Sequence, residues 1–188
     1  MQNRKHAILA GLMTLTVLAV NGTVSGAPED ATADAVLGQA GFTTNLANQG
    51  GANGTASTMN GNRGLCVDRV SGRLWVADTS NNRVLGFPNA AAFINGEAAD
   101  IVIGQADFTS IQANRGGANP AQNTLSGPRG VATDSASRLY VADTDNKRIL
   151  RFDPPFTNAM NAHQGFERAD ANTSTTQQRR NRDHSGKQ

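Results

Sequence analysis

The chain has 188 residues, of which 38% are hydrophobic and 17% are charged, and its formal net charge is +2 at pH 7. The basic excess lies at the two ends, because residues 28–156 hold ten Lys and Arg against twelve Asp and Glu. A nearly neutral body lacks the basic surface that attracts nucleic acid or anionic membranes. The single cysteine, Cys66, excludes a disulfide within the chain. We therefore expect no nucleic-acid partner.

The N-terminal residues 1–27 have the three parts of a secretory signal peptide. Residues 4–6 form a basic start, residues 7–20 an apolar stretch and residues 24–27 a cleavage zone of small side chains. The apolar stretch is too short to span a bilayer, which requires about 20 residues. We expect a secreted protein, extracellular or periplasmic, with no membrane anchor after the signal is cleaved.

Two parts of the remaining chain nearly repeat each other. The segment LGQAGF at 37–42 returns as IGQADF at 103–108, and LWVADTSNNRVLGF at 74–87 returns as LYVADTDNKRILRF at 139–152. Repeated units of strands cannot bury their own faces and need neighbours on which to stack. The number of copies therefore limits what the molecule can form.

Short apolar runs bounded by Gly, Asn, Asp and Ser predict strands within each copy. The first copy predicts strands at 64–68, 73–77, 83–87 and 100–104. The second copy predicts strands at 130–134, 138–142 and 148–152, with no fourth strand. Consecutive apolar positions indicate sheets that are covered on both faces, as in a propeller. We expect an all-β fold of four-stranded antiparallel propeller blades, with about two blades present and the propeller incomplete.

These assignments divide the chain into six parts. They are the signal peptide 1–27, an outer-strand segment with a Gly- and Asn-rich connection 28–63, a first blade 64–108, a second Gly- and Asn-rich connection 109–129, a three-stranded second blade 130–156 and a polar tail 157–188. The tail has a composition typical of disorder.

The turn between the second and third strands carries the sharpest signature, DTSNNR and DTDNKR. Asp and Asn side chains close such turns by accepting hydrogen bonds from nearby backbone N–H groups. The Arg that follows five residues after each Asp faces it across the hairpin, which allows a charge-assisted hydrogen bond. We interpret the turn residues as structural, with a binding role as the alternative. They are Asp78, Asn81, Arg83, Asp143, Asn146 and Arg148.

The ordered pattern of Gly, apolar strand, Asp, short loop, VADT strand and Asn-x-Arg resembles the NHL repeat, a blade unit of β-propellers. The resemblance covers residues 64–87 and 130–152. It implies that the LGQ-type segments are outer strands. The units are longer than the family pattern because residues 43–62 and 109–128, each containing GGAN, extend the connection between blades.

Catalytic chemistry has few candidates in this body. Resemblance to lyases of the NHL fold implies a histidine-held metal, yet residues 28–156 contain no histidine. Cys66 aligns with Ala132, which indicates a small buried hydrophobic residue rather than a nucleophile. We expect no catalytic residue, no metal and no cofactor.

One loop is rich in oxygen ligands, at Asp143, Asp145 and Asn146. It lacks the sixth-position Gly and the twelfth-position Glu of a helical-hand calcium loop, where Arg148 and Pro154 stand instead. That motif is rejected, and a generic cation site stays open as an alternative.

Two groups of residues are candidates for facing a ligand. Asp68 and Asp134 end the innermost strands and could face a channel mouth, although capping of the loop explains them equally well. The Gly- and Asn-rich insertions present Gln49, Asn53, Arg115 and Asn119, unless these insertions are plain flexible linkers. We expect a non-catalytic scaffold that binds protein or carbohydrate. The alternative is a fragment of a propeller-fold lyase or hydrolase whose catalytic residues lie in missing blades.

The repeat pattern stops inside the second blade. Its spacing predicts a further LGQ-like strand near Arg168, where the chain reads GFERADANTS. This suggests the hypothesis of a truncated or frame-shifted product of a longer gene. Two blades alone leave apolar faces open, so self-association through these faces, with three copies in a six-bladed ring, is an alternative.

Overall fold

The computed structural model describes residues 32–166. The chain divides into two compact units, 1–34 and 35–188, and only residues 32–34 of the first are described. The predicted signal peptide, and the predicted tail beyond residue 166, lie outside the described residues. Among residues 32–166, no helix is long and apolar enough to cross a membrane.

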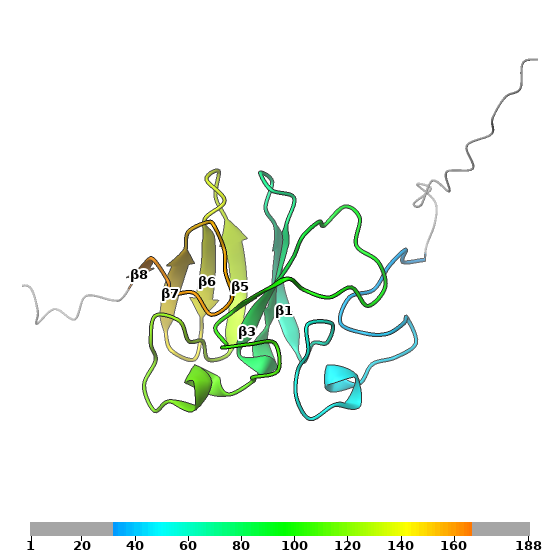
Figure 1. Cartoon of the computed structure of the whole chain (residues 1–188), viewed down its shortest axis with the longest axis horizontal. Helices are drawn as coiled ribbons and strands as arrows, with labels where there is room; N and C mark the ends of the chain where they lie inside the picture. The colour runs from blue at the N-terminus through cyan, green and yellow to red at the C-terminus, as the bar shows by residue number, and fades with distance from the viewer. Residues whose placement is uncertain (1–31, 167–188) are drawn as a thin grey trace, which may run out of the picture. The chain divides into compact units, whose positions relative to one another are not determined.

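Two antiparallel sheets form the second unit (Figure 1). The first sheet has the order β1 (Asn62–Val67), β2 (Leu74–Asp78), β3 (Arg83–Phe87) and β4 (Ile101–Ile103). The second sheet has the order β5 (Pro128–Thr133), β6 (Leu139–Asp143), β7 (Arg148–Phe152) and β8 (Gln164–Phe166). Three short 3₁₀ turns accompany them: η1 (Ala47–Gly50), η2 (Thr79–Asn81) and η3 (Ala113–Gly116). The prediction of an all-β fold of antiparallel blades in an incomplete propeller is confirmed.

The second sheet has a fourth strand that the sequence reading did not expect. Strand β8 pairs with β7, with Phe166 opposite Ile149, and Ala162 before it is buried. Residues 157–166 are therefore not part of a disordered tail. The fourth strand was not predicted because the β7–β8 loop is two residues shorter than the β3–β4 loop of the first copy. Equivalent hydrogen bonds show the change in spacing. The Ala99 N–H donates to the Ala56 carbonyl and the Ala162 N–H donates to the Gln122 carbonyl, so the acceptors are 66 residues apart and the donors only 63.

Residues 37–39 were predicted to form an outer strand, and this prediction was wrong. The segment consists of bends and pairs with no strand in the described part of the chain. The Val36 N–H donates to Asn95 Oδ1 at 2.9 Å, and the Val36 carbonyl accepts from Gly96 N–H at 3.0 Å. Val102 in β4 makes the same two contacts with Asn158 and Ala159. The segment around Val36 thus makes the loop contacts of an outer strand but pairs with no sheet among the described residues.

The two insertions are folded, so the interpretation as flexible linkers is wrong. Turns η1 and η3 share the same backbone, with Asn48 and Gln49 repeated by Asn114 and Arg115 at φ between 49° and 55°. Asn adopts this left-handed conformation more readily than most residues, which favours Asn at the first position of each pair.

The larger hydrophobic core lies between the two sheets. Its buried side chains are Trp75, Val84, Ile103, Leu125, Leu139, Val141, Leu150, Phe152 and Ala162. Trp75 meets the ring of Phe156 edge-on, with centroids 4.7 Å apart. A second core covers the other face of the first sheet. It contains Met59, Leu74, Val76, Leu85, Phe87, Ala99 and Val102. The first sheet is therefore packed on both faces.

Candidate functional site

The DTSNNR turn of the first copy closes around a buried ion pair. Arg83 Nε donates to Asp78 Oδ2 at 2.7 Å, and both side chains are fully buried. Asn81 Nδ2 donates to the same Asp78 oxygen at 2.8 Å, and the Asn60 N–H donates to Asp78 Oδ1 at 2.7 Å. The sequence reading placed Asp78, Asn81 and Arg83 in one turn, and the structure brings the three side chains into contact.

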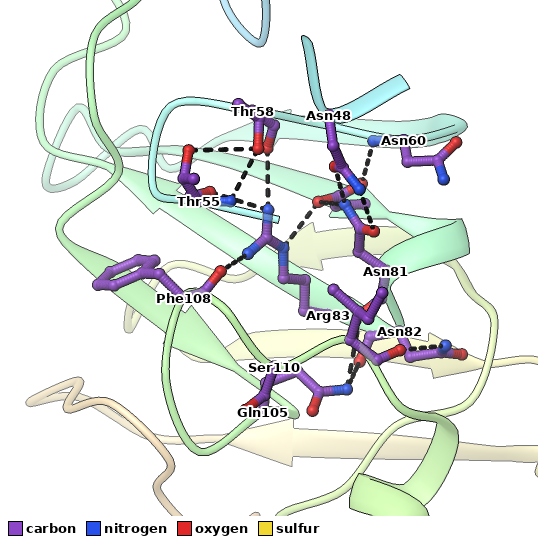
Figure 2. Close-up of polar contacts among 12 residues, drawn as sticks. Asn48, Thr55, Thr58, Asn60, Asn81, Asn82, Arg83, Gln105, Phe108 and Ser110 are labelled. Atoms are coloured by element: carbon purple, nitrogen blue, oxygen red, sulfur yellow. Dashed lines mark hydrogen bonds and ion pairs between the residues drawn. The ribbon is translucent and has the colours of Figure 1, made fainter. Parts of the chain in front are cut away.

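The rest of the Arg83 guanidinium binds three backbone carbonyls from two loops. Its Nη2 donates to the carbonyls of Thr55 and Thr58, both at 2.9 Å, and its Nη1 donates to the carbonyl of Phe108 (Figure 2). Four of the five N–H groups of Arg83 therefore donate hydrogen bonds, which offsets the cost of burying its charge. Arg83 therefore ties the first insertion and the GQADF segment to the first sheet.

The DTDNKR turn of the second copy repeats this arrangement, but its arginine is more exposed to solvent. Arg148 Nε donates to Asp143 Oδ2 at 2.8 Å, and Asn146 Nδ2 donates to the same oxygen at 2.8 Å. Arg148 Nη2 donates to the carbonyls of Ala121 and Thr124. The Arg148 side chain keeps 10% of its surface exposed, whereas Arg83 keeps none.

Each turn also contains an asparagine pair that the sequence reading missed. Asn48 and Asn81 exchange side-chain hydrogen bonds of 3.2 and 2.8 Å, and Asn114 and Asn146 do the same. The signal was present in the repeat, because Asn48 and Asn114 stand 66 residues apart in matching ANQG and ANRG segments. These pairs fix the insertions onto the turns.

A polar cavity of about 260 Å³ lies where the two insertions approach each other. Asn53 reaches it from the first insertion and Arg115 from the second, so the structure brings these two predicted ligand-facing residues together. The other lining residues are Gln105, Ala106, Thr109, Ser110, Ile111 and Gln112. Asn119 does not line the cavity and is exposed, and exposed Gln49 donates to the Ser57 carbonyl instead.

Gln105 is the most unusual residue of this cavity. Its side chain is fully buried, and Nε2 donates to the carbonyls of Asn82 at 3.0 Å and Gln112 at 2.8 Å. Its Oε1 has no hydrogen-bond partner among the described residues. A buried acceptor without a donor costs about 1 to 3 kcal/mol. Gln39, 66 residues earlier in the repeat, has the same unpartnered oxygen, so this buried atom is a feature of both copies and lies behind the accessible surface of the cavity.

Arg115 supplies the donor side of the same cavity. Its Nη2 donates to the Gln105 carbonyl at 2.9 Å and its Nε to the Gly104 carbonyl at 3.3 Å, which hold the guanidinium beside the cavity. Burial lowers the pKa of Arg115, and the negative charge of Asp107 partly offsets that effect. Arginine remains charged under all ordinary conditions. Asp107 has a pKa of about 2, because Thr109 and Ser110 donate hydrogen bonds to its carboxylate.

Comparison with protein families matches the two copies separately. The NHL repeat profile covers residues 63–87 and 125–152, which contain β2, β3, β5, β6, β7 and all of β1 except Asn62. The chain contains two NHL repeats. A search of curated proteins found no match to this chain.

Asp68 and Asp134 directly follow strands β1 and β5, where both close loops. Asp68 accepts from the N–H groups of Val70 and Ser71, and Asp134 accepts from the N–H groups of Ala136 and Arg138. Burial raises the pKa of Asp68, but hydrogen bonds from serine and backbone donors outweigh it, so the net shift is downward. These contacts support the capping alternative.

Asp134 differs from Asp68 in having a charged side chain among its donors. Its carboxylate also accepts from Arg138 Nε at 2.6 Å and from the Tyr140 hydroxyl at 3.1 Å. Burial opposes ionisation, yet the hydrogen bonds lower the pKa of Asp134 to about 2. The carboxylate is therefore ionised well below neutral pH.

A second cavity, of about 430 Å³, lies between the β1–β2 and β5–β6 loops of the two NHL units. Cys66 and Asp134 are among its lining residues. Burial raises the pKa of the Cys66 thiol, with a weaker opposing effect of Thr133, so the thiol is protonated at neutral pH. Among residues 32–166, no three side chains of His, Cys, Asp or Glu lie close enough together to hold a metal ion.

Proposed function

We propose that this NHL-repeat protein is an exported, non-catalytic interaction scaffold that binds an extended segment of a partner protein in the polar cavity between its insertions. The observation that carries the proposal is one cavity in which the exposed Asn53 side chain of the first insertion meets the half-buried Arg115 guanidinium of the second. An extended peptide presents backbone N–H and C=O groups side by side. The N–H can donate to the side-chain oxygen of Asn53, and the C=O can accept from Arg115.

The lining of the cavity favours a peptide over a sugar. Its polar groups come from amide and hydroxyl side chains, with one arginine, and no aromatic side chain lines it. Aromatic faces give apolar sugar surfaces a place to pack, whereas backbone groups require only well-placed donors and acceptors. Asp107 near Arg115 also makes the site unsuitable for strongly anionic ligands.

The position of the cavity supports a binding role. It is built from the insertions that lengthen the NHL units, while the turn clusters hold those insertions in place. Binding residues on loops are effective when a rigid scaffold positions them. Arg83 supplies part of that rigidity, because its guanidinium binds the carbonyl of Phe108 just before Thr109.

Selection from a displayed library of random peptides tests the proposal, with a glycan array as the parallel arm. We expect the wild-type chain to enrich peptides, and Arg115→Gln and Asn53→Ala each to weaken their binding at least about tenfold. Asn53 is exposed, so its variant should keep the unfolding midpoint of the wild type.

Arg63→Gln is the matched control, because Arg63 is exposed and does not line the cavity. Binding of glycans alone, or peptide binding that Arg115→Gln and Arg63→Gln weaken equally, would contradict the proposal.

A further inference from the structure

The interface between the two sheets is made of two different faces. The first sheet contributes Trp75 and Val84, and the second sheet contributes Leu139, Val141 and Phe152. Side chains alternate between the faces of a strand, so Tyr140 and Ile149 lie on the opposite face of the second sheet. Ile149 is 46% exposed there.

The repeat makes each exposed face equivalent to a face that is already packed. Tyr140 and Ile149 stand where Trp75 and Val84 stand in the first sheet. On the outer face of the first sheet, Leu74 and Val76 stand where Leu139 and Val141 stand in the second. The second sheet therefore exposes the counterpart of one half of the internal interface, and the outer face of the first sheet carries the counterpart of the other half.

The outer face of the first sheet is only partly covered. Leu65 and Val67 are 66% and 47% exposed, and a cavity of about 310 Å³ lies over this face. Phe93 lines the cavity, and it precedes Asn95 as Phe156 precedes Asn158. Phe156 is the ring against which Trp75 packs. The cavity beside Phe93 is thus the place that a Trp75-like side chain of another sheet would fill.

We propose that the second sheet of another copy of this chain covers the outer face of the first sheet, so that copies associate head to tail. Tyr140 of one copy then lies beside Phe93 of the next, as Trp75 lies beside Phe156 within the chain. Such an interface is heterologous, because the two copies contribute different surfaces. The proposal is independent of the peptide-binding function, since the polar cavity belongs to neither face.

The docking face of the second sheet is more polar than its internal counterpart. Arg151 takes the place of Gly86, and its Nε pairs with Asp153 at 2.9 Å. Ordering and desolvating such groups weakens association. We therefore expect a dissociation constant on the order of micromolar, tighter only if a ring closes.

Docking in this register also brings a second copy to the edge of β7. We call the copy that contributes its first sheet the acceptor and the copy that contributes its second sheet the donor. Leu37 of the acceptor corresponds in the repeat to Ile103, which pairs with Val84 in the first sheet. In the donor, Ile149 corresponds to Val84, and within the donor chain Ile149 already pairs with Phe166 of β8. Residues 35–37 of the acceptor and β8 of the donor therefore compete for β7. Gly165→Pro, which weakens β8, should strengthen association or leave it unchanged.

Sedimentation velocity of the purified chain over a range of concentrations tests the proposal. We expect species larger than a monomer. Leu65→Glu and Ile149→Glu, one on each face, should each give monomers. An equimolar mixture of these two variants should restore a dimer, because each retains the face that the other lacks. Leu46→Glu is the matched control, since Leu46 is 61% exposed and lines neither face.

Gly130→Ala provides a variant that leaves the folded chain intact. A Cβ on Gly64 would lie 2.4 Å from the Arg129 carbonyl oxygen across the internal interface, whereas a Cβ on Gly130 meets only Ala142 at 3.5 Å. Gly130 occupies the Gly64 position of the docking face, so Gly130→Ala should reduce association at least about tenfold with an unchanged melting curve. A monomeric wild type, or mixed variants that remain monomeric, would overturn the proposal.

Discussion

The two NHL units differ in burial although their strands have nearly the same sequence. Every residue of β2 and β3 is buried, whereas β6 and β7 are buried only at some positions. The first sheet has the second sheet on one face and side chains from residues 35–61 and 88–99 on the other. The outer face of the second sheet has no such cover among the described residues. Burial in this molecule therefore depends on neighbours, and the same VAD strand is core in one unit and partly surface in the other.

The largest expected difference between the units concerns the two turn arginines. Arg83→Gln should lower the free energy of unfolding by about 3 to 5 kcal/mol, because it leaves Asp78 buried without a counter-charge and three carbonyls without a donor. Arg148→Gln should cost about 1 to 3 kcal/mol, because its side chain is partly hydrated. Urea unfolding of both variants measures the difference. Equal losses would show that burial does not separate the two turns.

The next difference concerns the glycine at the start of each unit. Gly64→Ala should cost about 1 to 3 kcal/mol, because the new methyl group collides with the Arg129 carbonyl. Gly130→Ala should change the unfolding free energy by less than about 0.5 kcal/mol. Thermal melts at a concentration that keeps the chain monomeric compare the two. A destabilised Gly130→Ala would contradict an open outer face on the second sheet.

The contribution of Asp134 to stability should depend on pH. The pKa of Asp134 is about 2 in the folded chain, and an unfolded aspartate titrates near 3.9. Its stabilising contribution is therefore complete above about pH 4 and is lost as the pH falls towards 2. Asp134→Asn should be less stable at neutral pH and should lose less stability than the wild type between pH 4 and pH 2. Parallel acid titration curves would rule out this role.

The smallest effect is expected at Cys66. Cys66→Ala should change the unfolding free energy by about 1 kcal/mol or less, because alanine already stands at the matching position Ala132. The wild-type thiol should react slowly with a thiol-modifying dye at neutral pH, since burial raises its pKa. Reaction as fast as that of a free thiol would show that Cys66 is more accessible than its packing indicates.

Repetition allowed most of the fold to be predicted from the sequence. Strand β3 lies where it was expected, and the strands around it differ by one or two residues at their ends. The prediction failed where spacing changed, because the loop before β8 is shorter. The motif Ala106–Asp107 does recur as Ala169–Asp170, 63 residues later, and this spacing would have placed the strand correctly. It also failed at residues 37–39, because a strand requires a partner that the segment does not have.

The polar cavity could be predicted only in part. Composition indicated Asn53 and Arg115, because loop amides and charges stand out in sequence. Gln105 was overlooked because it lies in a segment read as an outer strand, and its unpartnered oxygen depends on how the second insertion folds back over it. Asn119 was selected by composition alone, and it does not line the cavity. Contacts between distant loops leave little trace in a single sequence.

Native-state hydrogen exchange tests the central comparison most directly. The backbone amides of β2 and β3 should exchange only through global unfolding, because their sheet is covered on both faces. The amides of β6 and β7 should exchange faster, through openings that leave the first sheet intact. Equal protection in the two sheets of a monomeric sample, or slower exchange in the second sheet, would contradict the account.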